Sequence, residues 1–194
     1  MHPFFKTNCP LSSRRKALLT DFQKRIGVKF KDLHLLDTAF YHRSFANETA
    51  GTAENNERLE FLGDAVLGMT AASYLYETLH DAPEGELTKI KSFVVSETSL
   101  SEIALDIGIE QCLCLGKGEE HSGGRSKKAI LADTTEAVFG ALYLDSGFKT
   151  AEKLILSLLV PQIRKVLENR HQKDYKTLLQ ELYQKKYKQC PHYE

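Results

Sequence analysis

Acidic residues at helical spacing are the part of this sequence best suited to chemistry. One segment places Glu57, Glu60 and Asp64 at i, i+3 and i+7, and a second places Asp133 and Glu136 three residues apart. At about 100° per residue, both spacings keep the side chains on one face of an α-helix. Like charges on one face repel each other, and a bound cation would relieve the repulsion. The two segments are therefore candidates for a cation site.

Small residues accompany both acidic segments, which bears on whether the two can meet. Gly63 and Gly68 lie in the first segment, and Gly140 lies in the second beside several alanines. Small residues let helix axes approach closely, which would merge the acids into one cage of oxygen ligands. Such a cage, without Cys or His, suits Mg²⁺ or Mn²⁺. The alternative is that acids in a first helical turn only stabilise the helix dipole, which leaves Asp64, two turns in, unexplained.

The elements that must position these acids are predicted to be helices, so the fold class is all-α. The periodicity of apolar residues predicts helices over 14–26, 32–41, 57–80, 86–107 (as one or two), 128–145, 148–168 and 174–188. Pro161 should kink or break its helix. Residues 46–56 are predicted to form a loop, and 116–126 a flexible glycine-rich turn or lid. That turn lacks the third glycine of a dinucleotide fingerprint, so no nucleotide cofactor is expected.

Composition fits an ordinary soluble globular protein, with 194 residues of which 42% are hydrophobic and 27% charged. No apolar run approaches the roughly 18–20 residues of a membrane span, and the N-terminus does not resemble a signal peptide, so a cytoplasmic protein without membrane partners is expected. The four cysteines lack zinc-site spacing and are expected to be reduced thiols: Cys9, Cys112, Cys114 and Cys190.

Charge is unevenly distributed although the net charge is zero. Basic residues predominate in 1–31 and 164–188, and acidic residues in 48–64. The basic ends could hold the phosphates of a nucleic acid. They could equally be solvated helix faces, and composition does not decide between the two.

Three motifs resemble those of the ribonuclease III family. Glu57–Ala65 (Glu-Arg-Leu-Glu-Phe-Leu-Gly-Asp-Ala) resembles the family signature, 116–145 is similar to its second motif region, and His42–Phe45 (His-Arg-Ser-Phe) resembles a third short element. The resemblance covers residues 14–168 and implies a helical endonuclease domain. Residues 174–194 resemble the start of an α-β-β-β-α double-stranded RNA-binding domain whose remainder this sequence lacks.

The resemblance implies a homodimeric, Mg²⁺-dependent endonuclease that cuts double-stranded RNA, including ribosomal RNA precursors, into products with 5′-phosphate and 3′-hydroxyl ends. Mn²⁺ is expected to replace Mg²⁺, and the number of ions per site stays open. The implied metal ligands are Glu60, Asp133 and Glu136, the implied catalytic residues are Asp64 and Glu136, and Glu57 is an auxiliary acid. The implied RNA contacts in the tail are Thr177, Gln180 and Glu181, for which a plain amphipathic helix is the alternative.

Two other functions remain open. A catalytically inactive relative with a structural or RNA-binding role should have lost acids of the signature, and this chain retains all of them. A small family member specialised for one RNA would lack an RNA-binding domain, and the motif at 174–194 speaks against that.

Overall fold

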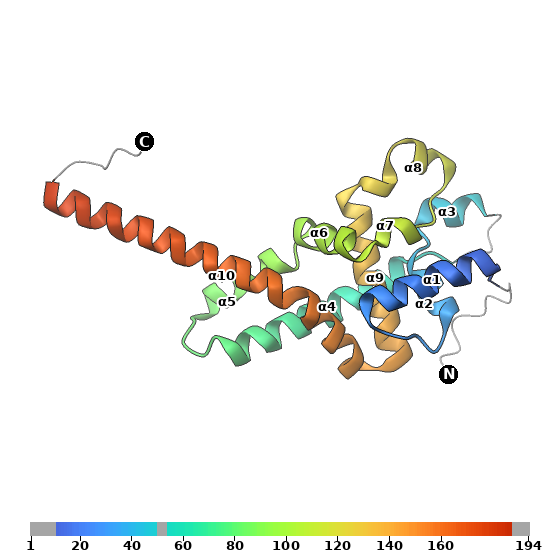
Figure 1. Cartoon of the computed structure of the whole chain (residues 1–194), viewed down its shortest axis with the longest axis horizontal. Helices are drawn as coiled ribbons and strands as arrows, with labels where there is room; N and C mark the ends of the chain where they lie inside the picture. Colours follow the sequence, from blue (N-terminus) through green and yellow to red (C-terminus); the bar gives the residue numbers. More distant parts are fainter. Residues whose placement is uncertain (1–10, 50–53, 188–194) are drawn as a thin grey trace. The chain divides into compact units, whose positions relative to one another are not determined.

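The computed structural model describes the backbone of residues 11–49 and 54–187, with the side chains at 169–182 and 185–187 left out. The regular secondary structure in this part of the chain consists of helices joined by short loops, with one isolated parallel bridge between Tyr41 and Cys114 (Figure 1). The helices are α1 (Ser13–Ile26), α2 (Leu33–Ala39), α3 (Arg43–Glu48), α4 (Glu57–Thr78), α5 (Glu84–Val94), α6 (Glu97–Ile107), α7 (Ile109–Cys112), α8 (Lys117–His121), the 3₁₀ turn η1 (Gly124–Ser126), α9 (Lys128–Ser146) and α10 (Phe148–Tyr187). The chain divides into two compact units, 1–159 and 160–194.

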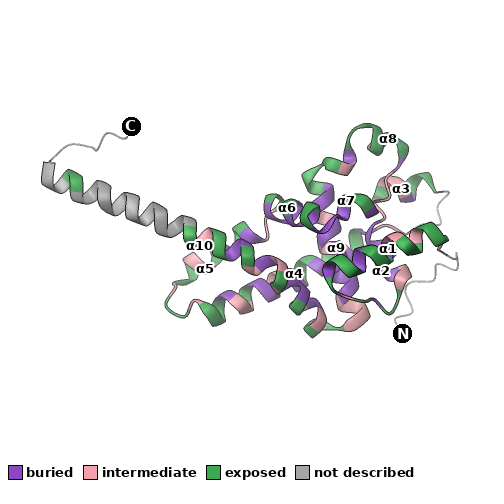
Figure 2. Cartoon of the chain, viewed as in Figure 1, coloured by how far each residue is buried: buried purple, intermediate pink, exposed green. Residues whose placement is uncertain are grey.

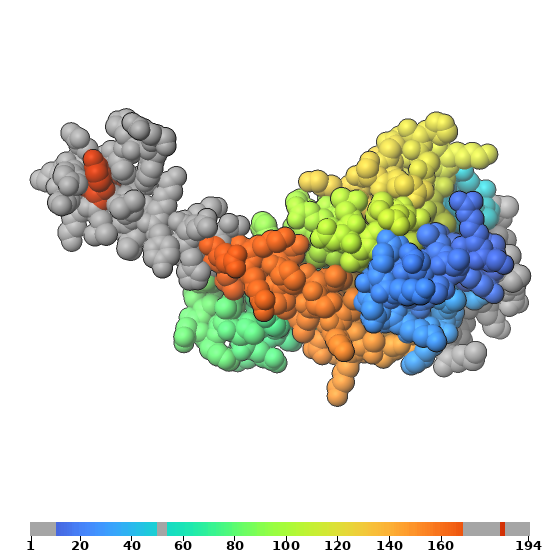
Figure 3. Space-filling model, viewed as in Figure 1, coloured from blue at the N-terminus to red at the C-terminus, as the bar shows by residue number. Residues whose placement is uncertain are grey.

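Helix α9 is the centre of the first unit. Eleven of its 19 residues are buried, and it packs against α4, α6, α2 and α7 (Figure 2). Its two buried threonines, Thr134 and Thr135, donate their hydroxyls to carbonyl oxygens one turn earlier, at 2.6 and 2.8 Å. No buried hydroxyl of α9 is therefore left without a partner. On the outside of this unit, α1 lies directly beside α6 and α7 (Figure 3).

Helices α4 and α9 cross with their backbones in contact. A Cβ atom added at Gly63 would lie 1.8 Å from the carbonyl oxygen of Glu136, and one added at Gly140 would lie 2.2 Å from that of Leu59. No side chain larger than hydrogen fits at either position. The expected close approach of the two acidic segments is thus present, and it depends on two facing glycines.

Helix boundaries follow local capping. Ser12 and Ser96 accept hydrogen bonds from backbone N–H groups in the first turns of α1 and α6. Gly27 and Gly108 end the same helices with φ of 67° and 74°, a left-handed conformation that glycine adopts without steric cost. The caps explain why α1 ends at Ile26 and α6 at Ile107, where the sequence predicts helix ends. The stretch predicted as one or two helices over 86–107 forms two, α5 and α6.

Helix α10 differs from the sequence-based prediction of two helices, since it runs unbroken from Phe148 to Tyr187 through Pro161. Proline removes one hydrogen bond and crowds the preceding turn, but neighbouring turns can continue the helix. The residues at 169–173, Asn-Arg-His-Gln-Lys, include no glycine or proline that would end it. The prediction of a break is therefore wrong.

The glycine-rich segment is also folded rather than a flexible turn. Its α8 and η1 are joined by the side chain of Arg125, which binds both carboxylate oxygens of Glu120 at 2.9 and 2.6 Å. Arg125 also donates to the carbonyl oxygens of Glu110 and Leu113. Similarly, α3 extends to Glu48, into the loop predicted at 46–56. Side-chain bonds to distant parts of the chain hold both segments, and such bonds leave no periodic signal in the sequence.

We predict that Gly63→Ala lowers the free energy of unfolding by about 3 kcal/mol or more, because the added methyl group forces α4 away from α9. The matched control is Gly85→Ala in α5, where an added Cβ has nothing within 4 Å. That variant should change stability by less than about 1 kcal/mol. Equal denaturation midpoints for the two variants would contradict the account of the crossing.

Candidate metal centre

Three carboxylates converge where α4 crosses α9. Glu60 from α4 and Asp133 and Glu136 from α9 each place one oxygen so that all three atoms lie within 4.8 Å of one another. All three side chains are half-buried. The crossing at Gly63 and Gly140 brings the two helix faces close enough for this convergence. The donor set consists of carboxylate oxygens alone, which matches the preference of hard divalent cations such as Mg²⁺ and Mn²⁺.

Electrostatics in this cluster oppose ionisation. Burial, followed by the charges of Asp64, Glu60 and Asp133, raises the pKa of Glu136 to about 8. Burial and the neighbouring acid Asp133 also raise the pKa of Glu60. Without a cation, the cluster therefore retains a proton near neutral pH. A divalent ion would replace that proton and offset the repulsion.

The other two predicted acids lie close by but outside the three-oxygen cluster. Asp64 is exposed on α4, and its charge is the main one acting on Glu136. Glu57 is exposed at the start of α4, where it accepts a hydrogen bond from the Asn55 amide at 3.0 Å and pairs with Arg43 at 4.0 Å. Neither Asp64 nor Glu57 contributes an oxygen to the three-carboxylate cluster.

Glu97 is an acid that the sequence analysis missed. It lies in the first turn of α6, and after burial its charge is the largest cause of the raised pKa of Asp133. No spacing links Glu97 to the other acids, because α6 reaches them only by packing on α9.

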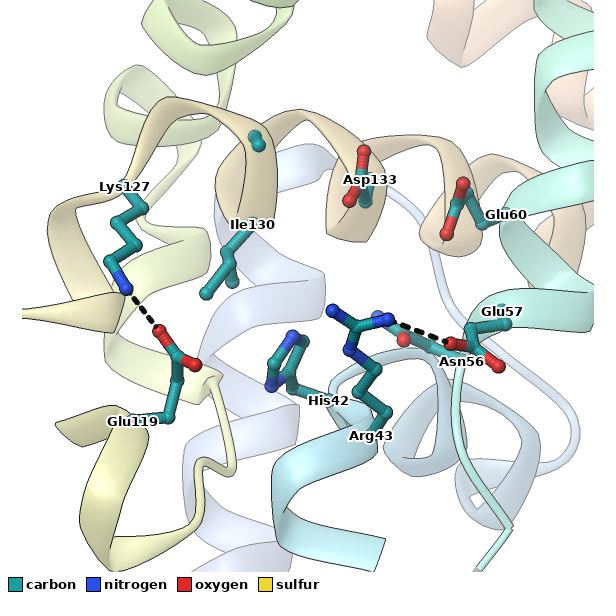
Figure 4. A pocket seen from close by; sticks show the side chains of 10 residues that line it. His42, Arg43, Asn56, Glu57, Glu60, Glu119, Lys127, Ile130 and Asp133 are labelled. Carbon is teal, nitrogen blue, oxygen red and sulfur yellow. Dashed lines mark hydrogen bonds and ion pairs between the residues drawn. The ribbon is translucent and has the colours of Figure 1, made fainter. Parts of the chain in front are cut away.

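A pocket of about 530 Å³ opens beside the cluster (Figure 4). One side carries Glu57, Glu60 and Asp133, and another carries His42, Arg43 and the ion pair of Lys127 with Glu119. The ammonium of Lys127 lies 2.7 Å from a Glu119 carboxylate oxygen. The pocket thus combines an anionic side for a cation with a side that offers hydrogen-bond donors.

The donor side is built by the short bridge between Tyr41 and Cys114. The His42 N–H donates to the Cys114 carbonyl at 3.2 Å, and the Cys114 N–H donates to the Phe40 carbonyl at 2.9 Å. Behind the bridge, Asp37 accepts hydrogen bonds from the Tyr41 hydroxyl and from Arg15. The sequence analysis covered His42 and Arg43 only within a short motif, and Glu119 and Lys127 only within the range 116–145. None of the four was singled out, because none shows a helical spacing to the acids.

The predicted RNA contacts at Thr177, Gln180 and Glu181 lie in α10, but their side chains are outside the described residues. Within the described part of the chain, none of the helices combines the length and hydropathy needed to cross a lipid bilayer.

Fold and site together define the class: a helical protein in which a cluster of three carboxylates that could hold a metal ion lies beside a polar pocket. A family model described as Ribonuclease-III-like matches residues 32–163. The Ribonuclease 3 of Treponema denticola is 59% identical over 190 residues, which cover 98% of this chain and 77% of that protein. The Ribonuclease 3 of Treponema pallidum is 50% identical over 194 residues, covering 99% and 76%.

Solved structures agree with the sequence comparison. The nuclease domain of ribonuclease III from Campylobacter jejuni is 36% identical and superposes with a TM-score of 0.68, covering 73% of this chain and 95% of that chain. The chain belongs to the ribonuclease III family. The expected family membership and helical fold are thereby confirmed.

We predict that the stability of the metal-free protein falls as pH rises from about 4.5 to about 8. Glu136 titrates at about 8 when folded and near 4.5 when unfolded, so in this window the folded state holds a proton that the unfolded state lacks. Glu136→Gln removes the titration. In EDTA, the variant should melt above the wild type at the upper end of the window and match it at the lower end. Parallel melting curves across the whole window would contradict this assignment.

Proposed function

We propose that this chain hydrolyses phosphodiester bonds of double-stranded RNA as a metal-dependent endoribonuclease, leaving 5′-phosphate and 3′-hydroxyl ends. The observation that carries the proposal is the convergence of Glu60, Asp133 and Glu136, which come from the two segments that resemble the family's motifs. Membership of the ribonuclease III family supports the same reaction. Ribosomal RNA precursors and other structured RNAs are the expected substrates.

Roles for the acids follow from their positions. Glu60, Asp133 and Glu136 would hold the cation, because their oxygens already share one small region. Asp64 and Glu136 would serve catalysis, Asp64 by orienting the attacking water from the exposed edge of the cluster. Glu57 would act as an auxiliary acid from the first turn of α4. When bound, a divalent ion lowers the pKa of a water molecule and neutralises charge on the phosphate.

Mg²⁺ is the proposed ion and Mn²⁺ its substitute. Both ions accept octahedral sets of oxygen ligands, and the three carboxylates leave room for water molecules to complete such a set. The raised pKa of Glu136 supports a site for positive charge, because burial and the neighbouring carboxylates both disfavour its ionised form and a bound cation would offset both effects.

A homodimer is the proposed assembly, since two sites related by a two-fold axis could cut both strands of one duplex. Helix α4 supports this proposal because it is apolar on two sides. Leu59 and Leu67 face the core, whereas Phe61, Met69 and Tyr76 are 81, 59 and 75% exposed. The intervals of eight and seven residues keep the exposed three on one face. A groove of about 420 Å³ between α4 and α5 lies beside Tyr76.

The proposed domains are a catalytic domain at 14–168 and the start of a double-stranded RNA-binding domain at 174–194. The supporting observation is the resemblance of 174–194 to the first helix of such domains. In that position Thr177, Gln180 and Glu181 would contact the minor groove of RNA, which proteins recognise by shape and 2′-hydroxyl groups.

We predict that Glu136→Gln abolishes cleavage of a long RNA duplex in Mg²⁺ while the variant stays folded, because it removes one metal-ligand charge. The matched control is Glu102→Gln on the exposed side of α6, which should cut like the wild type. Product ends should be labelled by a kinase only after phosphatase treatment, as 5′-phosphates require. Cleavage by Glu136→Gln at the wild-type rate, or by the wild type in EDTA, would overturn the proposed function.

We predict that Phe61→Ala raises the dissociation constant of the dimer by at least about tenfold, since large exposed aromatic side chains dominate association. Leu105→Ala is the control, because Leu105 is 54% exposed but lies on α6. Sedimentation velocity over a range of concentrations measures both. A monomeric wild type, or equal effects of the two substitutions, would argue against this face of α4.

A further inference from the structure

His42 holds the N-terminus of α3 through one ring nitrogen. Its Nδ1 accepts a hydrogen bond from the Ser44 N–H at 3.3 Å, and the Ser44 hydroxyl oxygen lies 2.8 Å from the same nitrogen. That hydroxyl oxygen already accepts the Gly116 N–H at 2.9 Å, so its own proton is free to point at Nδ1. With donors on both contacts, Nδ1 carries no proton. The proton of the neutral imidazole therefore lies on Nε2.

The surroundings of His42 fix this arrangement. An added Cβ at Gly116 would lie 2.5 Å from a Glu48 carboxylate oxygen and 2.7 Å from the Ser44 carbonyl, so α3 and the start of α8 are in tight contact. Glu48 also accepts the Lys117 N–H at 2.9 Å. Ser44 is thereby held between the two elements, and the imidazole ring cannot turn without breaking its hydrogen bonds.

The Nε2 side of the ring is available to a ligand. His42 lines the pocket beside the acid cluster, and among the described residues Nε2 has no hydrogen-bond partner (Figure 4). Burial lowers the pKa of His42, and the opposing effect of the Glu119 charge is smaller. The ring is therefore neutral at neutral pH. The other charges acting on the ring are those of Arg43, Asp133 and Glu57.

The donor side of the pocket has few groups that a phosphate could use without competition. The guanidinium of Arg43 faces Glu57 at 4.0 Å, and the ammonium of Lys127 is bound to Glu119 at 2.7 Å. Both cations are partly neutralised by these carboxylates. The Nε2–H of His42 is a neutral donor that no carboxylate occupies, and it is pre-oriented by α3. An oxyanion gains most from a donor that needs no reorganisation.

We propose that the Nε2–H of His42 donates a hydrogen bond to a non-bridging phosphate oxygen of the RNA strand in this pocket. The inference rests on the proposed function for the identity of the ligand. It assigns His42 two separable tasks, in which Nδ1 caps a helix and Nε2 binds the substrate backbone. The competing interpretation is that His42 is a helix cap alone.

Two substitutions separate the tasks. In His42→Asn, the amide oxygen can replace Nδ1 as the acceptor of the Ser44 N–H, but no donor reaches the position of Nε2. In His42→Gln, the amide nitrogen can reach that position, but the longer side chain is a poor cap. We expect His42→Asn to keep the wild-type melting temperature and to bind RNA about tenfold more weakly, as the loss of a hydrogen bond to a charged group implies. His42→Gln should melt a few degrees lower and keep its affinity to within about threefold.

Affinity is measured with the full chain and a short labelled RNA duplex in EDTA, so that no cleavage occurs, and kcat and KM are measured separately in Mg²⁺. A selective loss of affinity in His42→Asn, with KM raised more than kcat is lowered, supports phosphate binding. Wild-type affinity in a folded His42→Asn, or equal losses in the two variants, overturns it. If the wild type binds duplex through His42 but does not cut in Mg²⁺, the proposed hydrolysis fails while the role of His42 stands.

Discussion

The contact between the backbones of α4 and α9 is the constraint on which the rest of the structure depends. Gly63 and Gly140 face each other so closely that either Cβ would meet a carbonyl oxygen at 1.8 or 2.2 Å. Only this approach lets Glu60 of one helix share a small volume with Asp133 and Glu136 of the other. Because most residues of α9 are buried, its packing fixes the orientation of the helix and therefore the positions of Asp133 and Glu136. The same helix crossing therefore packs the core and brings the acids of the candidate site together.

The same crossing places carboxylates close enough to repel one another when they are ionised. Burial and neighbouring carboxylates raise the pKa of Glu136 to about 8, and those of Glu60 and Asp133 also shift upward. Such a cluster contributes little to the stability of the metal-free fold, because its charged form is disfavoured. It is suited instead to a divalent cation, which converts the repulsion into ligand attraction. Binding of a cation would explain why carboxylates occupy this helix crossing, where apolar side chains would pack without electrostatic repulsion.

Sequence reasoning recovered what periodicity and residue type encode. The spacing of Glu57, Glu60 and Asp64 predicted one acidic helix face, and that of Asp133 and Glu136 predicted a second. The nearby glycines predicted close contact between the two helices, and the structure has it. What it missed depends on contacts between distant segments. Arg125 folds the glycine-rich segment by binding Glu120 and two carbonyl oxygens, and Glu97 reaches Asp133 only through helix packing. At Pro161 the expected break is absent, because the turns on either side continue α10.

We propose that the carboxylates at the α4–α9 crossing hold a divalent cation. A crystal grown with Mn²⁺ and measured at the manganese absorption edge tests it most directly, since anomalous scattering locates the ion independently of activity. The account predicts an anomalous peak coordinated by carboxylate oxygens of Glu60, Asp133 and Glu136. A peak elsewhere, or an empty cluster at a saturating Mn²⁺ concentration, would contradict it.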